Sequence, residues 1–301
     1  MSTIFFLQLS LTPLLIAMLS ASSCALAGSF LVMRKQALIG DTISHVVLLG
    51  IVLAFTLTGQ LNSWLMMLGS LFAAALAALI IEMIHRLAKL ESTAAMGITF
   101  TTFFATGVLL LELSGSSSVH LDVEHALMGN IESLIWLDAT SWSSLLDPLA
   151  LALLPIELPR LVLVFAVLAC LLFIFWRPLV ITTFDEGFAQ ANGIQTKLVS
   201  LAIILGAALA AVAAFDAVGA ILSIAMFVCP AASARLLARS MAQMIALALL
   251  FANISAGLGF FVAGHLPLWL GFDASLSAAG MIACVSGLIL WSIMLIKAYR
   301  R

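Results

Sequence analysis

Long apolar stretches separated by short polar breaks dominate this chain. A helix of about 20 mostly apolar residues is long enough to cross the hydrocarbon core of a bilayer. The breaks divide the chain into segments of this kind at roughly 9–32, 42–59, 64–85, 94–113, 161–176, 198–214, 217–238, 242–263 and 274–296. The pattern therefore predicts an all-α, polytopic transmembrane bundle of about nine spans, with eight as the alternative, that occupies residues 1–301 as a single domain.

The positions of lysine and arginine predict the orientation of this bundle, because cytoplasmic loops collect them. If the basic C-terminus is cytoplasmic, nine alternating spans put eleven of the twelve basic residues on that side, and only Arg160 falls outside. We therefore expect the N-terminus outside, the C-terminus inside and residues 114–160 in an extracytoplasmic loop. The acidic residues of this loop either attract cations or simply reflect the bias of basic residues toward the other side.

Composition excludes a soluble catalytic domain. Hydrophobic residues make up 64% of the chain and charged residues only 9%, with a mean hydropathy of +1.25, whereas soluble domains have roughly 25% charged residues. The sequence contains no GxxxxGK[ST], GxSxG, HExxH or dinucleotide-binding motif. We therefore expect neither an enzyme nor a nucleic-acid-binding protein, and no permanently bound cofactor. Energy for active transport would have to come from a partner subunit or an ion gradient.

Asp41 and His45 are the first candidate metal ligands. They lie at the predicted start of the second span, in the sequence ALIGDTISH (37–45), and residues four apart share one face of a helix. Imidazole suits zinc and other transition metals, and carboxylates suit harder ions such as manganese. Ionisable groups in a membrane are costly and normally face a pathway. The alternatives are that Asp41 caps the helix after Gly40 and that His45 is a hydrogen-bonded interior residue.

Two weaker candidates lie toward the predicted outer face. The outer loop brings four potential ligands within six residues, His120, Asp122, Glu124 and His125. This cluster is either an outer site that receives metal, a docking surface for a delivery protein, or a solvated loop with incidental charges. Asp216, between two apolar segments, either caps a helix or faces the pathway.

The segment FDEGFAQANG (184–193) lies on the predicted cytoplasmic side. Asp185 and Glu186 open a short helical pattern, where acidic residues suit the positive end of the helix dipole. Gly193 follows where a helix C-terminus is expected. A short amphipathic helix in such a loop is suited to a groove on another protein, and an ordinary loop helix is the alternative.

Together with PAASARLL (230–237), the segments 37–45 and 184–193 resemble the permease subunits of metal-type ABC transporters. That family imports manganese, zinc or iron with a substrate-binding protein. The three segments occur in the family's order and on the expected sides, and the resemblance extends from about residue 10 to about residue 295. The segment 120–130 also resembles the outer loop of members associated with manganese or iron.

The resemblance implies that Asp41 and His45 line the metal pathway and that residues 183–196 form a cytoplasmic coupling helix seated on a separate ATP-binding subunit. The residues implied in this coupling are Asp185, Glu186, Phe188, Ala189 and Gly193. It further implies an extracytoplasmic metal-binding protein and a second permease chain, identical or different, in the bacterial cytoplasmic membrane. A proton-coupled metal transporter, a non-transporting membrane scaffold and an ABC permease for a metal chelate or cobalamin stay open as alternatives.

Overall fold

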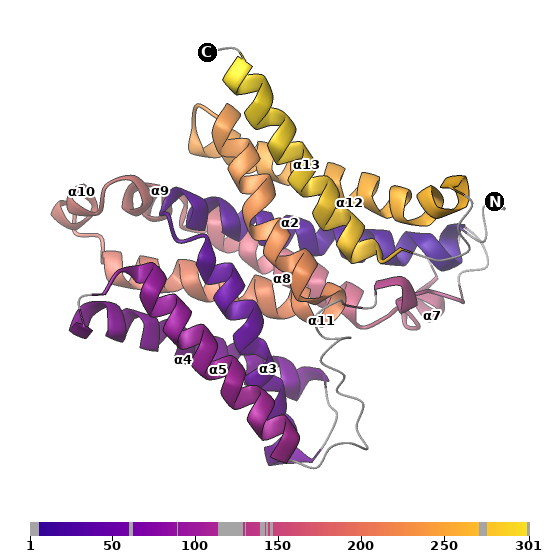
Figure 1. The fold of residues 1–301 in the computed structure, drawn as a ribbon, viewed down its shortest axis with the longest axis horizontal. Coiled ribbons are helices and arrows are strands. Elements are labelled where there is room, and N and C mark those ends of the chain that lie inside the picture. The colour runs from indigo at the N-terminus through magenta and orange to yellow at the C-terminus, as the bar shows by residue number, and fades with distance from the viewer. Residues whose placement is uncertain are drawn as a thin grey trace.

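The computed structural model describes residues 6–59, 63–88, 90–113, 129, 131–138, 142, 144, 147–270 and 276–299. Within these ranges the chain is helical without any strand, and eight helices are long and apolar enough to cross a membrane. They are α2 (Thr12–Met33, continuing η1, Leu7–Leu11), α3 (Leu38–Thr58), α4 (Ser63–Ala88), α5 (Ser92–Leu113), α8 (Glu157–Ile174), α11 (Thr196–Leu237), α12 (Met241–Leu270) and α13 (Ala278–Tyr299). The predicted all-α transmembrane bundle is confirmed (Figure 1).

The longest helix, α11, folds back on itself at Gly219. This residue has φ 80° and ψ 175°, values outside the helical region, and it separates residues 196–218 from residues 220–237. Near the start of α11, Ser200 accepts a hydrogen bond from Arg34, and near its end Arg235 donates one to the carbonyl of Val32. Both ends of α11 therefore lie beside the same end of α2, and its two halves correspond to two of the nine predicted spans.

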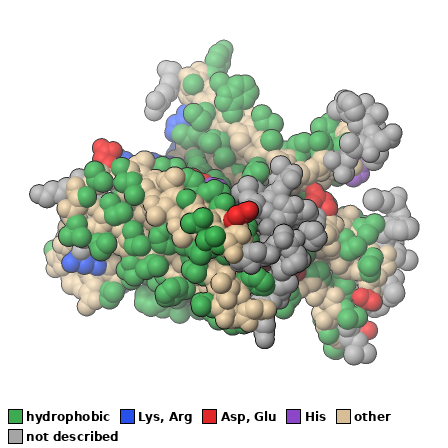
Figure 2. All heavy atoms as spheres, turned by 60° about the horizontal axis from the view of Figure 1, so that its bottom comes forward, with side chains coloured by type: hydrophobic (Ala, Val, Ile, Leu, Met, Phe, Trp, Pro, Cys, Tyr) green, Lys and Arg blue, Asp and Glu red, His purple; other side chains and the backbone are tan. Residues whose placement is uncertain are grey.

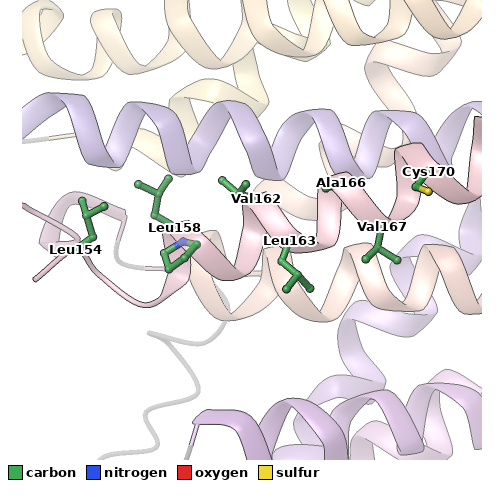
Figure 3. Close-up of a pocket in the computed structure, with 8 residues that line it drawn as sticks. Leu154, Leu158, Val162, Leu163, Ala166, Val167 and Cys170 are labelled. Atoms are coloured by element: carbon green, nitrogen blue, oxygen red, sulfur yellow. The ribbon is translucent and has the colours of Figure 1, made fainter. Parts of the chain in front are cut away.

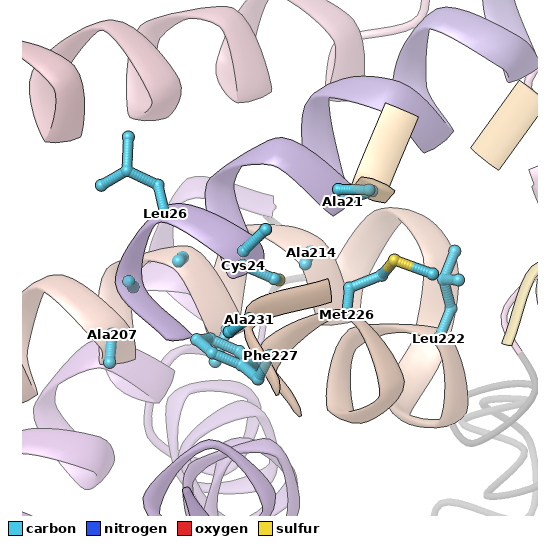
Figure 4. Packing of buried hydrophobic residues seen from close by; sticks show 14 of the residues in the cluster. Ala21, Cys24, Leu26, Ala207, Ala214, Leu222, Met226, Phe227 and Ala231 are labelled. Carbon is cyan, nitrogen blue, oxygen red and sulfur yellow. The ribbon is translucent and has the colours of Figure 1, made fainter. Parts of the chain in front are cut away.

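Small side chains allow α2 to pack closely against both halves of α11 (Figure 4). Ala21 and Cys24 on α2 and Ala207, Ala214 and Ala231 on α11 are among the buried residues of this core. A Cβ atom on Gly28 would collide with the backbone of Phe227. Since lipid provides no hydrophobic drive for helix association, close backbone approach of this kind is how membrane helices gain packing energy.

We name the end of the bundle that contains Arg160 the Arg160 end, and the opposite one the Arg34 end. The described residues 131–138 and 147–156 pack on the Arg160 end. Trp136 is 1% exposed, packs against Leu7 and donates a hydrogen bond from its indole to the carbonyl of Ala150. Ala150 belongs to the short helix α7 (Pro148–Leu151). The run 149–156, which is too short to span a membrane, thus packs partly on the bundle.

Much of the outer surface is apolar, as expected for a chain solvated by lipid. Outside the grey regions, Figure 2 shows hydrophobic side chains over much of the visible face, with charged side chains only in small spots. One face of α8 forms a shallow apolar groove of about 620 Å³ (Figure 3). Half of its lining repeats every four residues along the helix: Leu158, Val162, Ala166 and Cys170.

Candidate functional site

The start of α3 is held against the second half of α11 by close packing. Gly40 faces Phe227, and a Cβ atom on Gly40 would lie 2.8 Å from the Phe227 ring. One turn later the buried Ser44 hydroxyl lies 3.4 Å from that of Ser223 on α11. These contacts fix the rotation of α3 about its axis, which turns the adjacent positions, Asp41 and His45, away from this interface.

Asp41 and His45 form a pair on α3, on the face beside the one that carries Gly40 and Ser44. The distance between Asp41 Oδ1 and His45 Nε2 is 3.4 Å, and the two side chains are 39% and 20% exposed. Charged N–H···O hydrogen bonds are usually about 2.7–2.9 Å long, so the carboxylate and the imidazole form a loose pair and not a close hydrogen bond. The structure thus brings the two predicted ligands together.

Aromatic side chains of α5 pack against the imidazole. The ring centroids of Phe100 and Phe104 lie 4.7 and 5.6 Å from that of His45. They restrict the rotation of the imidazole, while Asp41 at its side stays partly exposed. Sequence reasoning missed these two residues, although their spacing of four on α5 is a signal that they share a face.

The interpretation of Asp41 as an N-cap is wrong. Helix α3 begins at Leu38, so that Asp41 lies inside its first turn, and no side chain caps the helix. The predicted second span began at 42 because Gly40 and Asp41 interrupt the apolar pattern there. Helix geometry tolerates both residues, and the apolar Leu38 and Ile39 already belong to the helix.

The other predicted metal ligands are not part of this pair. His120, Asp122, Glu124 and His125 lie outside the described residues. Asp216 is three residues before Gly219, and its carboxylate forms an ion pair with Arg160 at the start of α8. It therefore does not cap a helix, because it lies at the C-terminal end of the first half of α11. Among the described residues no three His, Cys, Asp or Glu side chains group as a metal cluster would.

The segment predicted as a cytoplasmic helix forms α10 (Glu186–Ala191), at the Arg34 end. The Asp185 carboxylate accepts a hydrogen bond from the backbone N–H of Phe188 at 2.9 Å, which caps the N-terminus. At the other end, the N–H groups of Gly193 and Ile194 donate to the carbonyls of Gln190 and Ala189, with Gly193 at φ 78°. This is a Schellman motif, which requires a left-handed residue and so favours glycine.

Helix α10 exposes one apolar side chain and buries another. Phe188 is 57% exposed and Ala189 is fully buried. The helix follows α9 (Trp176–Phe184), a short helix that the sequence did not predict, because the predicted fifth span ended at 176. Phe188 is thus presented on a short, capped helix at the end of the bundle.

Arg34 connects α10 to the bundle. Its guanidinium donates to Glu186 at 2.8 Å and to Ser200 at 2.5 Å, and its side chain is 8% exposed. Burial lowers the pKa of this guanidinium, while Glu186 and then Glu82 raise it. Sequence reasoning missed this contact, because no local pattern links residues 34 and 186.

Comparison with known proteins agrees with this architecture. Residues 7–297 match the ABC 3 transport family. The manganese transport system membrane protein MntD of Bacillus subtilis is 37% identical over 271 residues, which cover 90% of this chain and 88% of MntD. The zinc transport system membrane protein TroD of Treponema pallidum is 35% identical over 225 residues, covering 74% of this chain and 58% of TroD.

A solved structure is similar over nearly the whole chain. PsaBC from Streptococcus pneumoniae, in complex with Fab, matches with a TM-score of 0.71 and 29% identity, covering 94% of this chain and 89% of the other. The sequence match and the shared fold extend over the same helices. The chain therefore belongs to the ABC 3 transport family, as a membrane-spanning permease and not an enzyme.

Proposed function

We propose that this chain is the permease of an ATP-driven importer that moves a divalent transition-metal ion, manganese, zinc or iron, past Asp41 and His45. MntD and TroD are named for manganese and zinc transport, which supports this class of cargo. The metal is a substrate that passes through, so the site has to release it as readily as it binds it.

The spacing of the pair is the observation that carries the proposal. Two ligands that each lie about 2.1 Å from a tetrahedral ion are about 3.4 Å apart, and Asp41 Oδ1 and His45 Nε2 are separated by 3.4 Å. The pair supplies two ligands, fewer than the four of a closed structural zinc site. Water, backbone or a second permease chain would complete the shell, and such an incomplete shell favours release.

The proposed orientation has the Arg34 end in the cytoplasm and the Arg160 end outside. Eleven of the twelve basic residues then belong to the cytoplasmic side. The exception, Arg160, has a side chain that is 2% exposed and ion-paired with Asp216, so it is not a solvated loop charge. This orientation corresponds to a chain in the bacterial cytoplasmic membrane with its N-terminus outside.

Each end of the bundle has its own proposed protein partner. On the cytoplasmic side α10 would seat on an ATP-binding subunit, with Phe188 in a groove of that subunit and the Asp185 and Gly193 caps holding the helix. Movement of α10 would reach α2 and α11 through the contacts of Arg34 with Glu186 and Ser200. On the outer side a metal-binding protein would deliver the ion, and the loop with His120 and His125 is a candidate docking region.

Uptake of radioactive manganese and zinc by cells that carry the complete importer tests this function. We expect Asp41→Ala and His45→Ala each to lower uptake by at least the roughly 10- to 100-fold typical of losing even an outer-shell partner of a metal site. His265→Ala, which removes an imidazole elsewhere in the chain, should leave uptake unchanged. Normal uptake by Asp41→Ala at matched membrane expression would exclude the proposed pathway.

The same cells distinguish the alternative mechanisms. Depletion of ATP at a constant proton gradient should stop uptake, whereas a proton-coupled transporter would continue. A chelate permease would accept the chelated metal and reject the free ion, and a scaffold would show no uptake dependent on Asp41.

A further inference from the structure

A narrow apolar pocket opens between helices at the Arg34 end, away from Asp41 and His45. Its volume is about 270 Å³, and it is formed by α2, α8, α9 and the first half of α11. Every lining side chain is apolar; the residues that the argument uses are Leu168, Phe175, Pro178, Leu198, Ala202 and Gly206. Sites that enclose a drug-sized ligand have roughly 300–1,000 Å³, so this pocket suits a thin, unbranched chain.

The pocket extends into one half of the membrane only. Its lining on α11 runs from Leu198 to Gly206, which is about 12 Å along a helix axis at 1.5 Å per residue. The hydrocarbon core is about 30 Å thick. A hydrocarbon chain that enters the pocket from the Arg34 end therefore stays within a single leaflet.

Two cations directly precede residues that line the pocket at its Arg34 end, and one of them, Lys197, itself lines a neighbouring pocket with Glu82 and Glu186. Arg177 directly precedes Pro178, and Lys197 directly precedes Leu198. Both side chains are exposed, and neither has an ion pair or hydrogen bond within the described part of the chain. Basic residues beside pockets between membrane helices on the cytoplasmic side are typical of sites for anionic lipid head groups.

We infer that this pocket binds one acyl chain of an anionic phospholipid, whose phosphate is held by Arg177 and Lys197. The apolar lining suits the acyl chain of the lipid, and the length of the pocket corresponds to one leaflet. The two cations would neutralise the charge of the phosphate. The lipid would contact α9 and α11 on both sides of α10, so it would stiffen the connection that carries this helix. The site rests on the proposed orientation, which puts the Arg34 end in the cytoplasm, but not on the identity of the transported ion.

Retention of lipid by the purified full-length chain tests this site. The chain is reconstituted in phosphatidylcholine with a minor fraction of phosphatidylglycerol, extracted in mild detergent and analysed by native mass spectrometry. We expect wild type to retain phosphatidylglycerol preferentially. Ala202→Phe, which fills the pocket from an exposed position, should abolish this preference. Arg177→Gln with Lys197→Gln should weaken binding about fivefold for each cation removed.

Matched controls separate the pocket from general membrane contact. Ala246→Phe adds the same bulk to an exposed position of α12, and Arg239→Gln removes an exposed cation at the same end; both should retain phosphatidylglycerol as wild type does. Equal retention of the two lipids by wild type, unchanged retention by Ala202→Phe, or an equal loss with Arg239→Gln would overturn the inference. If Ala202→Phe does not fold, the exposed pair Arg177 and Lys197 still decides the outcome.

Discussion

At the scale of single residues, the chain pairs the ionisable groups of its helices in two different ways. Asp41 and His45 are loosely paired and partly exposed, with 3.4 Å between Asp41 Oδ1 and His45 Nε2. Asp216 is bound directly by the buried guanidinium of Arg160. The loose pair has capacity for another ligand, whereas the tight pair satisfies its own charges. We therefore propose that Asp41 and His45 bind the transported metal ion, and that Arg160 and Asp216 stabilise the fold.

Asp216→Asn should lower stability rather than metal recognition. It removes the charge that pairs with the buried guanidinium of Arg160. Because the Asp216 side chain is 40% exposed, solvent screens the pair, and the cost should lie below the roughly 3–5 kcal/mol of breaking a fully buried pair. Thermal unfolding of the purified protein in detergent should show a lower midpoint, while the dependence of the remaining uptake on metal concentration stays the same. An unchanged midpoint with a weaker apparent affinity for metal would instead make Asp216 a ligand.

The sequence predicted the pairing of Asp41 with His45 better than the residues around this pair. Asp41 and His45 were recognisable because two ionisable groups four apart in an apolar segment are costly without a purpose. Phe100 and Phe104, which pack against His45, and Ser223, which orients α3 through Ser44, look like any other residues of apolar spans. Their contribution depends on which helices are neighbours, and hydropathy alone does not determine that.

At the scale of elements, α10 and α11 show where local sequence is sufficient and where it is not. The helix α10 was predictable because Asp185 and Gly193 are strong local signals at its two ends. The reversal at Gly219 was predictable only as a gap between two apolar segments. The short helix α9 was not predicted. The fifth apolar segment ended at 176, close to the break at Phe175 with φ −99° and ψ 23°, and Arg177 placed the following residues in a cytoplasmic loop.

Phe188→Ala should weaken the assembly with the ATP-binding subunit. The change removes the 57%-exposed ring of α10 without altering Asp185 or Gly193. We expect less ATP-binding subunit to co-purify with the permease, and ATP-driven uptake to fall in proportion. Leu237→Ala, at a 47%-exposed apolar position at the end of α11, is the control. Equal co-purification for both variants would show that α10 is not the docking element.

At the scale of the whole molecule, two independent observations lead to nine membrane crossings. The reversal in α11 divides one of the eight long helices in the described ranges into two crossings, and the distribution of basic residues fits nine alternating spans. The contacts of Arg34 and Arg235 bring both ends of α11 to one end of α2. An odd number of crossings then leaves the two termini on opposite sides. The basic residues decide which side is cytoplasmic.

Labelling of introduced cysteines tests this orientation. In a variant without the four native cysteines, a membrane-impermeant maleimide should label Thr58→Cys and Asp138→Cys in intact spheroplasts. It should label Gln195→Cys and Arg239→Cys only after lysis, because these positions belong to the Arg34 end. The reverse pattern would show that the chain has the opposite orientation. Labelling of Asp138→Cys and Arg239→Cys from the same side would show that the number of crossings between these two positions is even, which would contradict two crossings by α11.

The most direct test of the central claim is a double-mutant cycle on ATP-driven manganese flux in proteoliposomes that contain the permease and its ATP-binding subunit. If Asp41 and His45 hold the same ion, Asp41→Asn and His45→Gln should each reduce flux strongly, and the double variant should be little worse than either single one, because effects of residues in one network do not add. Full activity of either single variant, or losses that simply multiply in the double variant, would contradict a shared metal site.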